Sequence, residues 1–418
     1  AADDKAQALF DNCFKILNGP DAPELTIQEL DQELIIYLTN PPTSNNYAER
    51  YEETDVTILP VPGSTIAALA NPDRKYRFQG YKVYQLRDET VTQTDLEDES
   101  KAKLIFQCDI KDGVARIINF EQDNTTGHLV PKLKVDGTDK GIIKSFRVTT
   151  DAFAVSTTGG TANNRLVNHK KYYFMAVAYA YNNYLTYKPD TDPVSSPDAN
   201  YLGQKRPYLE GRKVKKASGI PHINSPEKDG TALQSYYGYG PKITRIEGQG
   251  NGGNILDLTD ESIDKIIKNG FDPNPTYVNG RGPVNIKVID PLKIKNTTYT
   301  LKLMKWAGLN APAVPLTPTD GDVLNMGVVN PDRSTWVLID NNSGATYQLD
   351  TTIRMGKEYV IPEIGLSITM EQVLDPGTQL KGTTTYTVDR NTFQDGDFLE
   401  ATMTFADPHK AWLTGIAD

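Results

Sequence analysis

The stretch that decides the fold is Lys170-Lys171-Tyr172-Tyr173-Phe174-Met175-Ala176-Val177-Ala178-Tyr179-Ala180-Tyr181-Asn182. Aromatic and aliphatic residues fill it, and no Gly or Pro follows until Pro189. Such residues favour β-strands. Because both faces of this strand would be apolar, we expect it to lie in the middle of a sheet that is covered on both sides.

The totals describe an ordinary globular chain with room for several domains. It has 418 residues, 38% hydrophobic and 23% charged, with a net charge of −10. A nucleic-acid surface would need clustered Lys and Arg, so no nucleic-acid partner is expected. The one basic cluster, residues 212–216, favours a solvated strand or linker over a phosphate site. No apolar run approaches the ~20 residues of a membrane span.

Cysteine and histidine are scarce. Cys13 and Cys108 can form one disulfide, or Cys108 can be a buried free thiol, since Leu104, Phe106 and Cys108 alternate along one strand. The sequence leaves both alternatives open. The four histidines have no metal-ligand spacing, and no cofactor is predicted.

The first 150 residues predict one short helix followed by strands. Leu9, Phe10, Cys13, Phe14 and Leu17 have helical spacing, which predicts a helix over residues 3–17. Strands are expected at residues 25–27, 33–38, 56–59, 76–86 and 146–150. A hairpin is expected between residues 104–110 and 114–120, around Lys111-Asp112-Gly113.

A family resemblance appears at the strand quoted first. Leu166 lies six residues before Tyr172, and Tyr172, Phe174, Ala176 and Ala178 alternate along one face. This resembles the tyrosine corner and following strand of a fibronectin type III domain, with Leu166 and Tyr172 as the structural corner. Residues 81–84 and 34–37 resemble two other strands of that fold, although Tyr37 stands where Trp is usual. The resemblance implies an immunoglobulin-like sandwich over residues 21–222, with insertions at 43–75 and 121–142.

The same region is similar to domains of large cell-surface or secreted proteins of Bacteroidota. The segment that carries this similarity is Gly203-Gln204-Lys205-Arg206-Pro207-Tyr208-Leu209-Glu210-Gly211-Arg212-Lys213. The resemblance implies an extracellular location and export by type IX secretion. It also implies contacts with other domains of the same long chain, with outer-membrane secretion components or with other surface proteins. Since the sequence starts without Met and shows no C-terminal sorting domain, we expect a processed or excised piece.

A linker over residues 223–240 is predicted to join a second domain. Short strands at 243–247, 284–289, 298–304, 334–339, 345–349, 366–373 and 383–388 predict an antiparallel sandwich or jelly roll over residues 241–395. Thr259 and Gly270 can cap a helix that turns Ile263, Ile266 and Ile267 inward. The three Trp residues are expected in the core. Residues 396–418 are interpreted as a tail or the start of a further unit, and residues 1–20 as a helix leading from a preceding region.

Motifs for chemistry are weak. The glycine-rich residues 248–253 lack the Gly-Lys-Ser/Thr of a phosphate loop and favour a hairpin loop. The acidic residues 95–99 and 395–397 can offer oxygens to one structural Ca²⁺, although a solvated loop is the simpler interpretation. A carboxylate pair for glycoside hydrolysis is a third functional hypothesis, with no two carboxylates tied to one cleft. Hydrolase motifs of the Gly-x-Ser-x-Gly and His-Glu-x-x-His types are absent.

Two further sites complete the candidates. Tyr236, Tyr237 and Tyr239 lie beside glycines and can stack on a sugar ring, or pack a linker between domains. Asp350-Thr351-Thr352 resembles an acceptor of Bacteroidota O-glycosylation at Thr351. The sequence therefore favours a non-catalytic extracellular segment that acts as a spacer, adhesion surface or protein-binding platform. The alternative is an accessory carbohydrate-binding module.

Overall fold

The protein is an all-β chain of two compact units, Ala1–Thr231 and Ala232–Asp418. The computed structural model describes residues 2–11, 17–123, 125–154, 164–188, 203–224, 235–240, 258–272, 275–278, 281–282, 284–309, 311–315, 324–325, 328–329, 333–349, 351–354 and 356–370. Every strand ladder among them is antiparallel. The boundary between the units falls within the stretch predicted as a linker. None of the described helices is long and apolar enough to cross a membrane.

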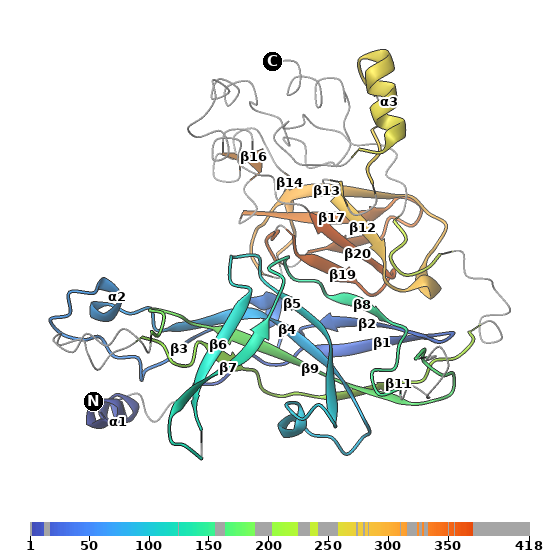
Figure 1. The fold of residues 1–418 in the computed structure, drawn as a ribbon. Helices are drawn as coiled ribbons and strands as arrows, with labels where there is room; N and C mark the ends of the chain where they lie inside the picture. Colours follow the sequence, from blue (N-terminus) through green and yellow to red (C-terminus); the bar gives the residue numbers. More distant parts are fainter. Residues whose placement is uncertain are drawn as a thin grey trace. The chain divides into compact units, whose positions relative to one another are not determined.

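The first unit contains a sandwich of two sheets (Figure 1). One sheet has the order β1-β2-β8, and the other runs β10-β9-β4-β3, with β11 pairing with β9 and β5 with β4. The strands are β1 (Glu24–Leu30), β2 (Glu33–Thr39), β3 (Glu52–Thr54), β4 (Lys75–Leu86), β5 (Ala102–Asp109), β8 (Ser145–Val148), β9 (Tyr172–Tyr181), β10 (Tyr208–Glu210) and β11 (Lys216–Gly219). Short helices add α1 (Ala2–Asp11), α2 (Ala67–Ala70), η1 (Tyr47–Glu49) and η2 (Gln93–Asp95).

Strand β9 is central and covered on both faces, which confirms the expectation from its sequence. Phe174 and Ala176 belong to the main core, together with residues of β2 and β8. Met175 and Val177 point the other way and pack with Leu86 and its neighbours. Alternate residues of a strand face opposite sides of its sheet, so a strand that is apolar throughout must be packed on both sides. Here one core cluster packs on each side of β9.

Gly80 lets the two longest strands of the sandwich pair. The β4–β9 register shifts between Phe78 and Gly80. A Cβ at Gly80 would lie 2.3 Å from the carbonyl oxygen of Cys108 and 2.5 Å from the Tyr179 hydroxyl. Only glycine fits so close an approach, so the break in the sequence pattern marks a bulge within one strand. Cys108 is a buried free thiol, and Cys13 lies outside the described residues.

Two predictions for this unit are wrong. β5 pairs with β4, and the strand after it, β6 (Arg116–Gln122), pairs with β7 (Leu129–Asp136), so the predicted hairpin of residues 104–110 and 114–120 does not form. The Asp139 carboxylate accepts both the Asp112 and Gly113 N–H groups, and the turn there is built by this distant side chain. Residues 56–59 form no strand, because the Asp55 side chain binds the Thr57 N–H and turns the chain.

The second unit contains two main sheets around its own core. Their orders are β12-β20-β19 and β14-β13-β17-β18, and β15 pairs with β16. Trp336, Leu338 and Ile368 lie in the core, whereas Trp306 is half-buried and Trp412 lies outside the described residues. The elements are β12 (Val284–Val288), η3 (Pro291–Lys293), β13 (Tyr299–Lys305), β14 (Val314–Pro315), β15 (Leu324–Asn325), β16 (Val328–Val329), β17 (Ser334–Asp340), β18 (Thr346–Gln348), β19 (Glu358–Ile361) and β20 (Leu366–Met370).

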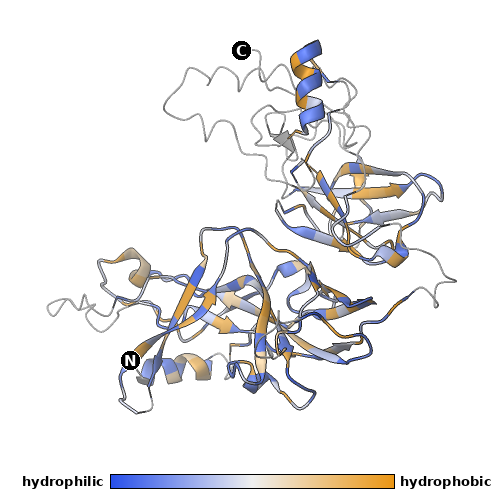
Figure 2. Cartoon of the chain, turned by 45° about the vertical axis from the view of Figure 1, so that its right-hand side comes forward, coloured by the Kyte–Doolittle hydropathy of each residue, from blue (hydrophilic) through white to orange (hydrophobic). Residues whose placement is uncertain are grey.

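Helix α3 (Asp260–Asn269) has its predicted ends but not its predicted packing. Thr259 accepts the Ser262 N–H at the N-cap, and Gly270 ends the helix at φ 82°. Hydrophobic and hydrophilic residues alternate along it (Figure 2), yet Ile267 is 78% exposed. The buried residue of the helix is Ser262, whose hydroxyl is hydrogen-bonded to the Thr276 hydroxyl at 3.0 Å. The inward orientation predicted for Ile263 and Ile267 is therefore wrong.

Leu166 and Tyr172 meet at the start of β9, and both are buried. The Tyr172 hydroxyl accepts the N–H of Val167 at 2.9 Å, five residues upstream. This is the hydrogen bond that defines a tyrosine corner.

Replacing Tyr172 by Phe should lower the free energy of unfolding of the first unit by about 1 kcal/mol, because the Val167 N–H loses its acceptor. Tyr173→Phe is the matched control, since the Tyr173 hydroxyl donates to the exposed Glu89 carboxylate at 3.1 Å. We expect a change within about 0.5 kcal/mol for the control. Urea unfolding followed by far-UV circular dichroism measures both, and equal losses would count against a corner role for Tyr172.

Candidate functional site

The candidate site is a turn of residues 235–240 in the second unit, here called the aromatic turn. The Tyr239 N–H donates to the Tyr236 carbonyl at 3.1 Å, which closes a β-turn. Gly238 sits at its third position with φ 84°, a backbone conformation that costs other residues free energy. The glycine beside the tyrosines is therefore required by the turn itself.

The aromatic turn is fixed to the edge of strand β12. The Gly238 N–H donates to the Val288 carbonyl, and the Val288 N–H donates to the Tyr239 carbonyl, both at 2.9 Å. This pair of hydrogen bonds resembles one step of a sheet ladder. It sets the position of the turn, so the tyrosines on it project from a rigid strand.

Tyr237 anchors the turn through a half-buried ionic network. Lys287 of β12 donates to the Tyr237 hydroxyl at 3.1 Å and lies 5.0 Å from the centre of its ring. The same ammonium group is 2.8 Å from the Glu358 carboxylate, which also accepts the Ser367 hydroxyl at 2.6 Å. Burial works against the charge of Lys287, but Glu358 and Tyr237 raise its pKa above the ordinary value. The positive charge of Lys287 is therefore balanced by the Glu358 carboxylate.

Tyr236 and Tyr239 are the parts of the turn that a ligand can reach. They are 64% and 45% exposed, and the other described tyrosines are buried or half-buried. Their ring centres lie 5.6 Å apart with the planes at 67°. The three tyrosines predicted as one set thus divide into an anchor and an exposed pair.

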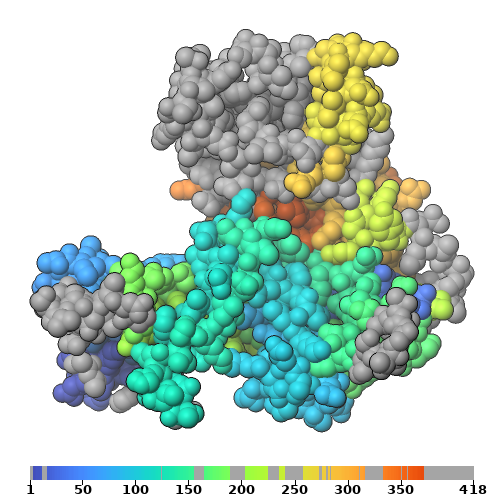
Figure 3. All heavy atoms as spheres, viewed as in Figure 1, coloured from blue at the N-terminus to red at the C-terminus, as the bar shows by residue number. Residues whose placement is uncertain are grey.

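A second exposed surface, which sequence reasoning missed, lies on the two-stranded ribbon β6–β7. Ile117 and Val135 pack inward on Tyr179 and Tyr208. On the opposite face of the ribbon the apolar residues Ile118, Leu129 and Leu133 are exposed, whereas the Phe120 ring packs edge-on against Tyr187 with their ring centres 4.6 Å apart. The ribbon lies at the surface in teal tones in Figure 3. We call this opposite face the ribbon face and define it by Ile118, Phe120, Leu129, Pro131 and Leu133. The alternating apolar residues of 129–135 were the signal that could have revealed the missing strand.

The segment 203–213 has a structural role in the first unit. Asp21 is 3% exposed, and its carboxylate binds Arg212 and Lys213, both at 2.9 Å. At Gly211 a Cβ would lie 2.3 Å from the Ala178 carbonyl oxygen, so the chain passes too close for a side chain. We call Asp21, Arg212 and Lys213 the clasp, because they tie the entry of β1 to the segment after β10.

The clasp predicts an acid-dependent stability. Burial works to raise the pKa of Asp21, but hydrogen bonds from Lys213, Asn45 and Arg212 hold it below the ordinary value. A lowered pKa adds stability above the unfolded value of about 3.9, and that stability is lost as the pH falls through the folded value. Asp21→Asn should therefore cost about 1–2 kcal/mol at pH 7, a figure discounted because both cations are half exposed.

The difference between the Asp21→Asn variant and the unchanged protein should shrink below about pH 4, because the unchanged protein then loses its charged carboxylate. Urea unfolding at several pH values between 3 and 7, on the order of one per unit, measures this difference. A difference that stays constant or grows in acid would show that the Asp21 charge contributes nothing.

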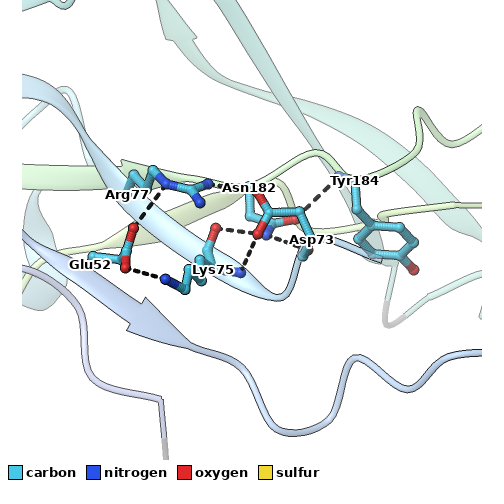
Figure 4. A network of polar contacts seen from close by, with 6 residues as sticks. All are labelled: Glu52, Asp73, Lys75, Arg77, Asn182 and Tyr184. Atoms are coloured by element: carbon cyan, nitrogen blue, oxygen red, sulfur yellow. Dashed lines mark hydrogen bonds and ion pairs between the residues drawn. The ribbon is translucent and has the colours of Figure 1, made fainter. Parts of the chain in front are cut away.

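Other polar clusters also hold the fold together. Glu52 of β3 binds Lys75 and Arg77 of β4, and Asp73 binds Arg77 at 2.6 Å. The Asn182 amide, at the end of β9, donates to the Asp73 and Lys75 carbonyls. Figure 4 draws this network, which comprises Glu52, Asp73, Lys75, Arg77, Asn182 and Tyr184. Its ionic side chains are about half exposed, so the network adds little to the free energy of unfolding. Its main effect is to align the ends of the strands.

The acidic loop at residues 95–99 has lysine partners. Asp95 binds Lys101 at 2.6 Å and caps the 3₁₀ turn η2. Glu97 binds Lys132 and Lys134, and these bonds lower its pKa to about 2. Among the described residues no group of three or more Cys, His, Asp or Glu side chains is arranged to hold a metal ion. The acidic residues 395–397 and the glycine-rich loop 248–253 lie outside the described part of the chain.

Thr351 is poorly placed for modification. It is 7% exposed, and its hydroxyl donates to the Thr352 carbonyl at 3.2 Å. The acceptor pattern at Thr351 therefore offers no accessible hydroxyl in the folded chain.

Comparison of the chain with protein-family models, with curated proteins and with solved structures finds no match.

Proposed function

We propose that the chain is a non-catalytic, extracellular segment of a large bacterial cell-surface or secreted protein exported by type IX secretion. It would act as a spacer, an adhesion surface or a protein-binding platform. Its partners would be other domains of the same long chain, outer-membrane secretion components or other surface proteins. The observation that carries the proposal is the ribbon face, an exposed apolar surface of the first unit. The ionic clusters described above stabilise the fold and form no catalytic site that we can assign.

The strand order supports a fibronectin type III-like first unit. The sheet β1-β2-β8 faces a sheet in which β9 lies between β4 and the strands β10 and β11. An immunoglobulin-like sandwich has the same division, with the first, second and fifth strands against the third, sixth and seventh. The hydrogen bond from the Val167 N–H to the Tyr172 hydroxyl adds the tyrosine corner.

The ribbon face has the character of a protein contact. Leu129 and Leu133 are 40% and 47% exposed, and Ile118 is paired with Leu133 across the ribbon. Exposed apolar patches of this kind mark interaction sites. The edge strand β7 also contains Pro131 and two lysines, features that discourage strand addition. We therefore expect a partner to pack on the face and not to extend the sheet.

Photo-crosslinking in the producing cells tests this surface. A photoreactive amino acid at position 133 lies on the ribbon face, and one at position 132 lies on the opposite face of the same strand. We expect a crosslinked product from position 133 and at most a trace from position 132. Equal yields from the two positions, or no product from position 133, would contradict the proposal.

A carbohydrate-binding module is the second candidate. The observation that favours it is the exposed pair Tyr236 and Tyr239, held on a turn that is fixed to β12. Aromatic rings with a polar tip serve both apolar contact and hydrogen bonding. A glycan array distinguishes this candidate from the first, because a protein-binding platform should retain no glycan.

A further inference from the structure

We propose that the aromatic turn binds a single pyranose ring of a neutral glycan, stacked on the ring of Tyr236 or Tyr239. The proposal rests on the second candidate function above and adds the chemical class of the ligand. It starts from the two exposed rings, which meet at 67° with their centres 5.6 Å apart. Two rings at this angle form a corner in which one can stack on a sugar while the other offers its hydroxyl.

The site is ready before a ligand arrives. The turn is closed by the bond from Tyr239 to Tyr236 and is held on Val288 by two further backbone bonds. The Tyr237 hydroxyl accepts a hydrogen bond from the Lys287 ammonium group. A tyrosine side chain has only two rotatable bonds, so ordering it costs little entropy. Preorganisation of this kind increases affinity without adding contacts.

The charge around the turn selects a neutral ligand. Among the described residues, Lys287 is the cation that contacts the turn, and its ammonium group is 2.8 Å from Glu358 and 3.1 Å from the Tyr237 hydroxyl. Its charge is therefore balanced within the protein and offers little to a uronate or a sulfate. The whole chain has a net charge of −10, which also repels polyanions.

The size of the exposed surface selects a sugar. A stable protein partner needs about 800 Å² on each side, more than two tyrosine rings can supply. A pyranose ring presents a face of C–H groups that matches one aromatic ring, and its hydroxyls can meet the phenolic groups. Gluco-configured sugars are the best fit, because their equatorial hydroxyls leave both ring faces open to stacking. With one or two rings in contact, the Kd should be on the order of 0.1–1 mM.

Affinity electrophoresis is suited to binding this weak. The full chain runs through native gels that contain xyloglucan or mixed-linkage β-glucan as neutral probes, or polygalacturonate or dextran sulfate as acidic probes. We expect retardation by at least one neutral glucan and none by the acidic polymers. Tyr236→Ala and Tyr239→Ala should each weaken binding by about two- to tenfold, and Tyr236→Trp should retain it.

Phe10→Ala is the matched control, because Phe10 is a 63% exposed aromatic ring on α1, outside the aromatic turn. It removes an exposed ring and leaves Tyr236, Tyr237 and Tyr239 in place, so retardation should persist. Retardation by the acidic polymers alone, retardation that survives the double change Tyr236→Ala and Tyr239→Ala, or no retardation in any gel would overturn the proposal. Retention of neutral glycans other than these glucans, lost with the same two variants, would support carbohydrate binding while overturning the preference for glucose. None of these outcomes affects the crosslinking expected from the ribbon face.

Discussion

Phe174→Ala should lower the free energy of unfolding of the first unit by about 3–5 kcal/mol. Phe174 is fully buried at the centre of β9, where it packs in the core shared by both sheets. Deleting its ring removes apolar burial and leaves a cavity that surrounding strands can fill only in part. Phe10→Ala is the control, because Phe10 is 63% exposed, and we expect a change within about 0.5 kcal/mol.

The distribution of tryptophan makes this measurement specific. All three Trp residues lie in the second unit, so their fluorescence follows that unit, whereas far-UV circular dichroism follows both. In a urea titration Phe174→Ala should move the dichroism transition of the first unit and leave the tryptophan transition in place. Movement of the tryptophan transition alone would contradict the assignment of Phe174 to the first core.

Lys287→Met should destabilise the second unit by about 3–5 kcal/mol, because it removes the ammonium group that pairs with the buried Glu358 carboxylate. Glu358 is 2% exposed and lies 2.8 Å from the lysine ammonium. The same change should free the aromatic turn, since Lys287 holds the Tyr237 hydroxyl. Tryptophan fluorescence in urea measures the stability, with Trp336 as the buried reporter.

The double variant Lys287→Met with Glu358→Leu tests whether the loss comes from the buried charge of Glu358. Replacing both members of a buried pair by apolar residues is often neutral. We therefore expect the double variant to recover most of the stability that Lys287→Met loses. If the double variant is as unstable as the sum of the two single variants, the two residues act independently and the network described above is wrong.

The sequence predicted elements whose signals are local. The apolar run of β9 determines its central place, because no other position covers both faces. Thr259 and Gly270 mark the ends of α3 through bonds within a few residues of each cap. Gly80 was recognised as a break, and the structure shows a bulge there.

Elements that depend on distant residues were not predictable in the same way. The turn at Asp112 and Gly113 is built by Asp139, about 26 positions further on, so the local Asp-Gly signal gave the wrong strand pairing. Ile267 has the spacing of a core residue, yet the bonded pair Ser262 and Thr276 sets which side of α3 is buried. The spacing of apolar residues shows that a helix is amphipathic, but it does not show which side of the helix packs against the rest of the protein.

The candidate site shows the same limit. The tyrosines beside Gly238 were identified from the sequence, but their division into an anchor and an exposed pair was not. That division depends on Lys287, about 50 residues away, which binds Tyr237. The ribbon face was missed altogether because β6 was assigned to a different partner strand.

We propose above that the chain lies outside the cell, and amine labelling of intact producing cells tests this location most directly. A membrane-impermeant amine reagent should modify Lys215, whose side chain is 71% exposed. Lys82 is 6% exposed and should stay unmodified in the folded chain, which controls for unfolding. We predict equal labelling of Lys215, measured by mass spectrometry, in intact and in lysed cells. Labelling that appears only after lysis would contradict the account.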